Sequence, residues 1–378
     1  MIDGQKYSEF DGYLLQSEPH KRDKALAWKT AIGLQDVDGL TPSAYLLETA
    51  KRHIDGDISI DDVRDLLDSY YEAKTSRTTD DDKTEEADKV SANITKLLNE
   101  QTFSFSPAGL AAIHGRIFDG VFKFAGRFRD CNISKREWVL RGESVLYVGF
   151  AEIKPALEHD FNNEKEFSYK NLMPDDMIKH FVKFISGIWQ IHPFREGNTR
   201  ATAVFAIKYL RAMGFSVSNG LFAEYSWYFR NALVRANYRN YARRVEPEFE
   251  YLENFFRNLL LGENNELKNR YLVIAAPEDL IGQVERTSTG QVPDNFTSDN
   301  PNILQLVNVI GNDELSVKEM MRLVDLRHRE TFLNNYLTPA VKEGFIRLLY
   351  PASPRHPRQR YLLTVKGLAI YQALKMDN

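Results

Sequence analysis

The chain has 378 residues, 43% of them hydrophobic, and a formal net charge of −4 at neutral pH. This length predicts two or three domains, the apolar content suffices for packed cores, and the slight acidity excludes a general nucleic-acid binder. The single cysteine, Cys131, excludes an intrachain disulfide. We expect a cytoplasmic protein without membrane association, because the sequence has no run of 18 apolar residues and no signal-peptide pattern at its start.

The N-terminal part, residues 20–75, is predicted to be helical. Helices are expected at Ala25–Leu34 and Ser43–Ile54, and Ser59 is a good N-cap for a third helix. The acidic turn Asp36–Gly39 lies between the first two helices.

An acidic stretch, Thr-Thr-Asp-Asp-Asp-Lys-Thr-Glu-Glu, follows at residues 78–86. Charged stretches of this kind are usually solvated, so we expect a loop before a helix at about 84–99 rather than a functional acidic patch. The next helix contains His114. We interpret this residue as a core or surface histidine, because no metal-ligand cluster accompanies it in the sequence.

Residues 132–150 carry two short apolar segments on either side of Gly142. Val139-Leu140 and Val145-Leu146 are predicted to form the strands of a β-hairpin. Farther along, apolar residues recur at helical spacing from Ile178 to Trp189, and a second apolar stripe runs through residues 201–213. The segment between these two helices is predicted to be a tight turn.

That turn has the sequence His192-Pro193-Phe194-Arg195-Glu196-Gly197-Asn198-Thr199-Arg200. Pro193 stops the first helix, and the free N–H groups that begin the second helix favour an anion such as phosphate. Glu196 can hold Mg²⁺ between phosphate oxygens, and the planar guanidinium of Arg200 can bind the outer phosphates. His192 titrates near neutral pH and can take a proton from an attacking hydroxyl.

This turn closely resembles the signature HxFx[D/E]GNxR of the Fic (filamentation-induced) family, with all six fixed positions matched. The resemblance extends to Phe124–Arg129, similar to the segment before the family's flap. It implies that His192 is the general base for a target hydroxyl and that Glu196 binds Mg²⁺. It also implies that Asn198 and the Gly197 amide hold the α-phosphate of ATP and that Arg200 holds the β- and γ-phosphates.

The same resemblance implies roles for further residues. Arg195 and Thr199 fill variable slots of the phosphate loop, and Tyr228 and Asn231 lie on a predicted helix like the one that lines the nucleotide base. The expected flap residues, which would align a target segment by strand addition, are Val139, Leu140, Val145 and Leu146.

The expected reaction is transfer of AMP from ATP to a Tyr, Thr or Ser hydroxyl of a target protein. Thr199 stands where many AMP-transferring members have Gly and a kinase-like branch has Lys. Because Thr is small and uncharged, we favour AMP transfer. Two alternatives stay open: a nucleotide-sensing transcription regulator, and a Fic enzyme that removes AMP or transfers phosphate or another nucleotide. Fic proteins often form homodimers, and the sequence leaves the oligomeric state open.

The N-terminal helices resemble a small antitoxin-like module that accompanies some Fic proteins. In that module a [S/T]xxxE[G/N] helix presses its Glu against the second motif arginine and blocks productive ATP binding. The matching segment here is Leu34–Gly39, where Asp38-Gly39 keeps the charge and Leu34 replaces the hydroxyl residue. We therefore hypothesise that Asp38 pairs with Arg200 and restrains activity. The alternative is an acidic turn unconnected with the site.

Residues 281–300 are rich in Gly, Ser, Thr, Asn, Asp and Pro, which predicts a linker. Beyond it, three helices and a hairpin resemble a winged helix-turn-helix. The expected elements are Asn302–Ile310, Ser316–Val324, Arg329–Lys342, Phe345–Tyr350 and Arg360–Thr364. Residues 301–378 hold 11 Lys plus Arg and 7 Asp plus Glu. Both DNA binding and protein docking or dimerisation fit this section.

We therefore expect a mainly α fold, with a Fic helical core, a β-hairpin flap and a C-terminal winged helix-turn-helix domain. The expected division is 1–80 for the antitoxin-like regulatory segment, 81–280 for the catalytic domain, 281–300 for the linker and 301–378 for the winged-helix domain. The expected cofactors are ATP and Mg²⁺.

Overall fold

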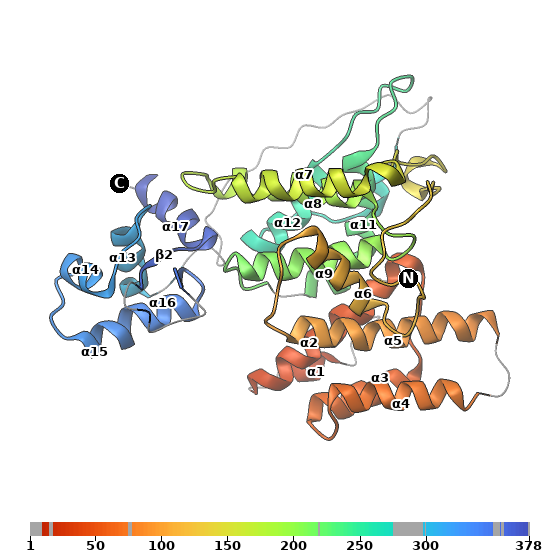
Figure 1. The fold of residues 1–378 in the computed structure, drawn as a ribbon, viewed down its shortest axis with the longest axis horizontal. Helices are drawn as coiled ribbons and strands as arrows, with labels where there is room; N and C mark the ends of the chain where they lie inside the picture. Colours follow the sequence, from red (N-terminus) through yellow and green to blue (C-terminus); the bar gives the residue numbers. More distant parts are fainter. Residues whose placement is uncertain are drawn as a thin grey trace.

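The computed structural model describes residues 10–14, 18–74, 78–217, 220–274, 298, 300–350, 356 and 359–376. Within these residues the fold is mainly helical, as predicted, with one two-stranded sheet (Figure 1). No helix of the described part is long and apolar enough to cross a membrane. The predicted linker 281–300 lies outside the described residues, apart from Ser298 and Asn300.

The N-terminal helices form one layer of the molecule, drawn in red to orange in Figure 1. Ser59 caps its helix through a capping box with Asp62, as its sequence position predicts. The elements are α1 Asp11–Leu14, α2 Pro19–Gly33, the 3-10 turn η2 Leu34–Asp38, α3 Ala44–Asp55, α4 Ile60–Glu72 and α5 Thr79–Asn99.

The acidic stretch 78–86 is not the predicted loop. It forms the first two turns of α5, because Thr78 and Asp81 make a capping box and three aspartates lie in the first turn, where the helix dipole favours negative charge. The prediction took the charge as a sign of a solvated loop and overlooked this capping pattern.

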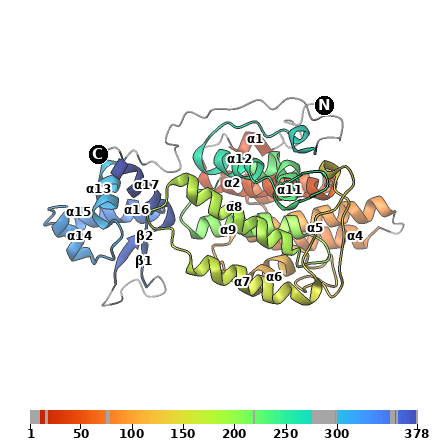
Figure 2. The ribbon, with the colours of Figure 1, turned by 90° about the horizontal axis from the view of Figure 1, so that it is seen from above.

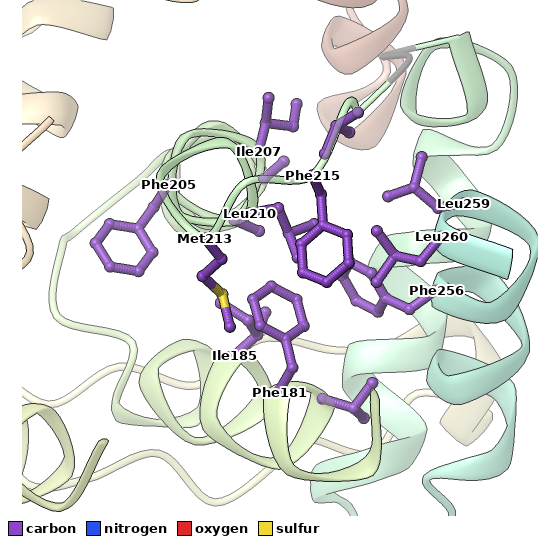
Figure 3. Packing of buried hydrophobic residues seen from close by; sticks show 14 of the residues in the cluster. Phe181, Ile185, Phe205, Ile207, Leu210, Met213, Phe215, Phe256, Leu259 and Leu260 are labelled. Atoms are coloured by element: carbon purple, nitrogen blue, oxygen red, sulfur yellow. The ribbon is translucent and has the colours of Figure 1, made fainter. Parts of the chain in front are cut away.

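The central part contains most of the remaining helices. Its elements are α6 Pro107–Ile117, η3 Trp138–Leu140, η4 Phe150–Glu152, α7 Ile153–Glu166, α8 Pro174–Ile191, α9 Asn198–Ala212, α10 Gly220–Glu224, α11 Ser226–Asn237, α12 Glu250–Leu261 and η5 Asn269–Leu272. In Figure 3, aromatic and aliphatic side chains from α8, α9, α12 and the segment after α9 point toward one another. Each buried side chain of this kind contributes about 1.5–3 kcal/mol, so this core fixes the positions of α8 and α9 and of the turn between them.

The predicted flap hairpin is wrong in its secondary structure. Trp138–Leu140 is a 3-10 turn, and residues 141–149 contain no strand. The carbonyl of Val139 accepts a hydrogen bond from the Ile274 amide at 2.9 Å. This carbonyl therefore bonds to the region after η5 and not to a second strand of a hairpin. Consecutive burial of Val139 and Leu140 also breaks the alternation of a half-exposed strand.

The C-terminal elements follow the predicted order. They are α13 Pro301–Ile310, α14 Val317–Leu323, α15 Arg329–Phe332, the π-helical turn η7 Leu333–Leu337, α16 Thr338–Lys342, β1 Ile346–Leu348, β2 Tyr361–Leu363 and α17 Val365–Met376. The strands β1 and β2 pair antiparallel, with Arg347 opposite Leu362. Most of the turn between them lies outside the described residues, including Arg355 and Arg358. The assignment as a winged helix-turn-helix stays a prediction.

The C-terminal section lies at one end of the molecule and packs on the central helices (Figure 2). Gly214, after α9, and Gly344, before β1, bring their backbones together. A Cβ on Gly214 would lie 2.4 Å from the Gly344 carbonyl oxygen, and both glycines have positive φ. Thr364 donates a 2.6 Å hydrogen bond to the same carbonyl. Only glycine allows this contact, so the end of α9 is tied to the C-terminal section.

Candidate functional site

The signature segment forms the predicted turn between α8 and α9. His192 ends α8 in the left-handed conformation, with φ 51°, and Gly197 precedes α9 with φ 74°. A Cβ on Gly197 would lie 2.1 Å from a ring carbon of Phe118, so this glycine is required by a neighbouring side chain as well as by its φ. No side chain caps the start of α9, which leaves first-turn amides of the kind that favour an anion.

Two polar side chains hold the turn in shape. Asn198 accepts a hydrogen bond from the Phe194 amide at 2.9 Å and donates one to the Phe194 carbonyl at 2.8 Å. His114 accepts a hydrogen bond from the Gly126 amide through Nδ1, so its Nε2–H donates to the Glu196 carbonyl at 3.0 Å. His114 is fully buried and stacks on Phe194, as expected for a core histidine, and it also positions the turn.

His192 is buried and has one free ring nitrogen. Its Nδ1 lies 3.2 Å from the Trp189 carbonyl oxygen, which can only accept, so the neutral ring carries its proton on Nδ1. Its Nε2 has no hydrogen-bond partner among the described residues. Burial, followed by the positive charge of Lys135, lowers the pKa of His192 well below 6.5. The ring is therefore neutral, with a lone pair on Nε2 that no described residue hydrogen-bonds, and Tyr147 stacks on it at 4.0 Å between ring centroids.

The side chains of Glu196, Arg195 and Thr199 contact different parts of the structure. Glu196 forms an ion pair with Lys135, 2.9 Å from Nζ to Oε2, and its side chain is half exposed. Arg195 pairs with Asp130 on the surface. Thr199 is buried and accepts a 3.0 Å hydrogen bond from the Trp189 indole, so its hydroxyl contacts α8. This partner gives Thr199 a packing role within the helix pair.

Arg200 is the most enclosed charge of the motif, with 2% of its side chain exposed. Its guanidinium contacts Asp38 at 2.9 Å, which is the pairing that the sequence suggested. It also contacts Glu86 of α5 at 2.8 Å and Gln35 of η2 at 2.9 Å. The Phe118 ring lies 4.8 Å from the guanidinium carbon. The contacts with Glu86 and Gln35 were not predicted, and Glu86 was expected at the end of a solvated stretch.

A cavity of about 720 Å³ lies beside Asp38. Trp138, Tyr228 and Arg230 are among its lining residues, and neither His192 nor Glu196 is. Asn231 lies behind the wall, where it donates a 2.8 Å hydrogen bond to the lining residue Asn269. Its own Oδ1 is buried without a partner among the described residues. The structure thus brings Tyr228 to this cavity and places Asn231 one layer deeper.

The four predicted flap residues are not equivalent. Val139, Leu140 and Val145 are buried in the core, and their role in aligning a target segment stays a prediction. Leu146 is 86% exposed, and its carbonyl accepts a hydrogen bond from Gln190 of α8.

The fold and the site define a helical protein with a neutral base, a carboxylate and a buried arginine grouped around one interhelical turn. Residues 104–210 match the Fic/DOC family, and residues 301–364 match the family described as Filamentation induced by cAMP protein Fic-like, C-terminal domain. The chain therefore carries a Fic/DOC family domain followed by a Fic-like C-terminal domain.

Solved Fic structures are similar at low sequence identity. A Fic family protein from Desulfovibrio desulfuricans G20 is 18% identical, with 95% of this chain and 94% of that chain covered and a TM-score of 0.42. The N-terminal Fic domain of a Bartonella effector protein from Bartonella sp. AR 15-3 is 20% identical, with 49% and 84% covered and a TM-score of 0.38. BepC protein with bound AMPPNP from Bartonella tribocorum is 18% identical, with 50% and 94% covered and a TM-score of 0.37.

The buried His114 generates a prediction about acid stability. Burial lowers its pKa to about 4, whereas an unfolded histidine titrates near 6.5. The unfolded chain therefore takes up a proton first, and this residue alone lowers the free energy of unfolding by up to ~3 kcal/mol as pH falls from 6.5 to 4. In His114→Gln, urea titrations across this pH range should show a smaller decrease in the free energy of unfolding.

The matched control is the exposed His159→Gln, which should keep the full loss of stability in acid. Equal pH dependence in wild type and His114→Gln would contradict the assignment of His114 as a buried neutral histidine.

Proposed function

We propose that this chain is an adenylyltransferase that moves AMP from ATP, with Mg²⁺, onto a Tyr, Thr or Ser hydroxyl of a target protein. The observation that carries the proposal is the buried Nε2 of His192, which has no partner among the described residues. A sensor that only binds nucleotide needs no such base. The Fic/DOC match over residues 104–210 supports the same reaction class, because members of this family generally transfer nucleotidyl groups.

Each group of the site has a defined task in this reaction. His192 accepts the hydroxyl proton at Nε2, while the Trp189 carbonyl fixes the ring through Nδ1. The first-turn amides of α9 hold phosphate oxygens. Arg200 neutralises the outer phosphates once its present partners are displaced. Glu196 is a half-exposed carboxylate, the type of ligand that Mg²⁺ takes together with phosphate oxygens. When bound, Mg²⁺ supplies neutralisation of phosphate charge.

The contacts of Arg200 support a restrained enzyme. Asp38 and Glu86 occupy the guanidinium, so phosphate has to compete with two carboxylates for the same donors. Asp38 also borders the 720 Å³ cavity that contains Tyr228, which we propose as the nucleotide-base pocket. In this proposal η2 acts as the inhibitory segment, and Glu86 adds a second restraint from α5.

The transfer itself is tested with ATP labelled on either the α- or the γ-phosphate, in the presence of Mg²⁺ and a cell lysate that supplies targets. We expect protein-bound α-label with wild type and a loss of at least about 100-fold in His192→Ala, because the general base is removed. Since burial keeps the pKa of His192 well below 6.5, transfer should persist between pH 8 and 6.5.

Protein-bound γ-label would instead establish phosphate transfer. Absence of label with bound ATP would leave the nucleotide-sensing regulator as the better description of the chain.

The restraint is tested by removing the two carboxylates singly and together. Asp38→Ala and Glu86→Ala should each raise the rate of α-label transfer about fivefold, equivalent to ~1 kcal/mol, and the double variant should exceed both. The control is Glu85→Ala, which removes a neighbouring carboxylate that pairs with Lys89. Equal rates in wild type and the double variant would show that Arg200 is not restrained by these contacts.

A second candidate function, DNA binding, is favoured by the exposed basic side chains of the C-terminal section. Arg322, Arg327, Arg329, Arg347 and Arg360 are all exposed. Contacts from such side chains to DNA phosphates release counterions, so the affinity of the protein for DNA should fall steeply with salt.

This candidate predicts binding of a labelled DNA duplex in fluorescence anisotropy at 50 mM salt. The paired change Arg327→Gln and Arg329→Gln should reduce the slope of log affinity against log salt by about two. The same change at the exposed Lys154 and Lys165 of α7 serves as control. A lack of binding at low salt would leave protein docking as the role of this section.

A further inference from the structure

Lys135 connects the segment before η3 to the motif turn. Its backbone amide donates a 3.2 Å hydrogen bond to the Ser144 hydroxyl, which anchors the segment at that point. Its ammonium reaches across to Glu196, with Nζ 2.9 Å from Oε2. The two residues lie 61 positions apart in the sequence, so this contact belongs to the folded site and not to local structure.

The two arginines of the motif are engaged by other carboxylates. Arg195 pairs with Asp130, and Arg200 is held by Asp38 and Glu86. Lys135 is therefore the cation that neutralises Glu196 in the described part of the chain. It also lies close enough to the base for its charge to lower the pKa of His192.

In the ion pair between Lys135 and Glu196, another cation can replace the ammonium. Their side chains are 25% and 53% exposed, so solvent weakens the attraction between them. An ammonium is a compact, flexible point charge, whereas a divalent cation places twice the charge at shorter distance from carboxylate oxygens. A divalent cation that binds Glu196 therefore competes directly with the ammonium.

We propose that Lys135 is a positioning residue that occupies the metal ligand Glu196 before nucleotide arrives, and that the divalent cation displaces it. This inference rests on the proposed function, because it takes Glu196 as the Mg²⁺ ligand. Displacement also breaks the contact that Lys135 makes with the motif turn, while the ion pair between Arg195 and Asp130 remains. Metal binding and release of Lys135 are therefore one event.

The affinity for metal tests the proposal without any transfer reaction. Mn²⁺ is titrated into the full chain in the presence of a saturating non-hydrolysable ATP analogue, whose phosphate oxygens complete the metal site, and binding is followed by the relaxation of water protons. Lys135→Met should bind Mn²⁺ about two- to fivefold more tightly than wild type, because a competing cation is gone. Lys135→Arg, which keeps the charge, should stay near wild type.

Two further variants show whether a negative result concerns the competition by Lys135 or the assignment of Glu196 as the metal ligand. Arg136→Met removes the neighbouring positive charge, which lines the cavity while Lys135 makes the ion pair with Glu196, and its effect should be smaller than that of Lys135→Met. Unchanged or weaker Mn²⁺ binding in Lys135→Met would overturn the competition. Unchanged Mn²⁺ binding in Glu196→Gln would instead overturn the metal assignment within the proposed function.

Hydrogen exchange supplies a readout of the segment itself. In wild type, Mn²⁺ should increase amide exchange in the peptide that covers residues 130–140, because the ion pair opens. In Lys135→Met this peptide should exchange faster even without metal. Exchange that stays equal in both proteins, with and without Mn²⁺, would show that the ion pair does not hold the segment and would overturn the proposal.

Discussion

The buried charge of Arg200 is the constraint on which the arrangement of the site depends. A guanidinium with 2% of its surface exposed is stable only when paired, since removal of a charge from water costs several kcal/mol. Its partners come from different elements: Asp38 and Gln35 from η2, and Glu86 from α5. The N-terminal layer is thus part of the environment of the motif.

Two contacts explain why η2 lies beside Arg200. Asp88 of α5 is buried and accepts hydrogen bonds from the Ser43 amide, the Ser43 hydroxyl and the Tyr71 hydroxyl, which joins α3 and α4 to α5. Gly33, the residue before η2, lies so close to Ala223 that a Cβ would meet its carbonyl oxygen at 2.5 Å. Together with burial of the apolar face of α2, these contacts place η2 beside α9.

The sequence predicted those features that depend on local pattern. Pro193 and Gly197 mark the turn between α8 and α9, Ser59 marks a helix start, and the spacing of apolar residues gives the helices. Prediction from the sequence failed where tertiary contacts determine the local structure. Glu86 looked solvated because nothing local shows that it meets Arg200, 114 residues away. The flap segment contains strand-forming residues, yet the Val139 carbonyl accepts its hydrogen bond from Ile274, a partner that no local pattern reveals.

Because two carboxylates contact the Arg200 guanidinium, one of them can leave while the other still neutralises the arginine. If η2 withdraws, Asp38 leaves Arg200, but Glu86 belongs to α5 and stays within the helical body. Arg200 then keeps one partner, and the cost of an unpaired buried charge is avoided. Because Asp38 borders both the cavity and Arg200, a ligand that binds the cavity more tightly when η2 has withdrawn must also favour release of the arginine. Such coupling is reciprocal, so phosphate on Arg200 would in turn strengthen binding of that ligand in the cavity.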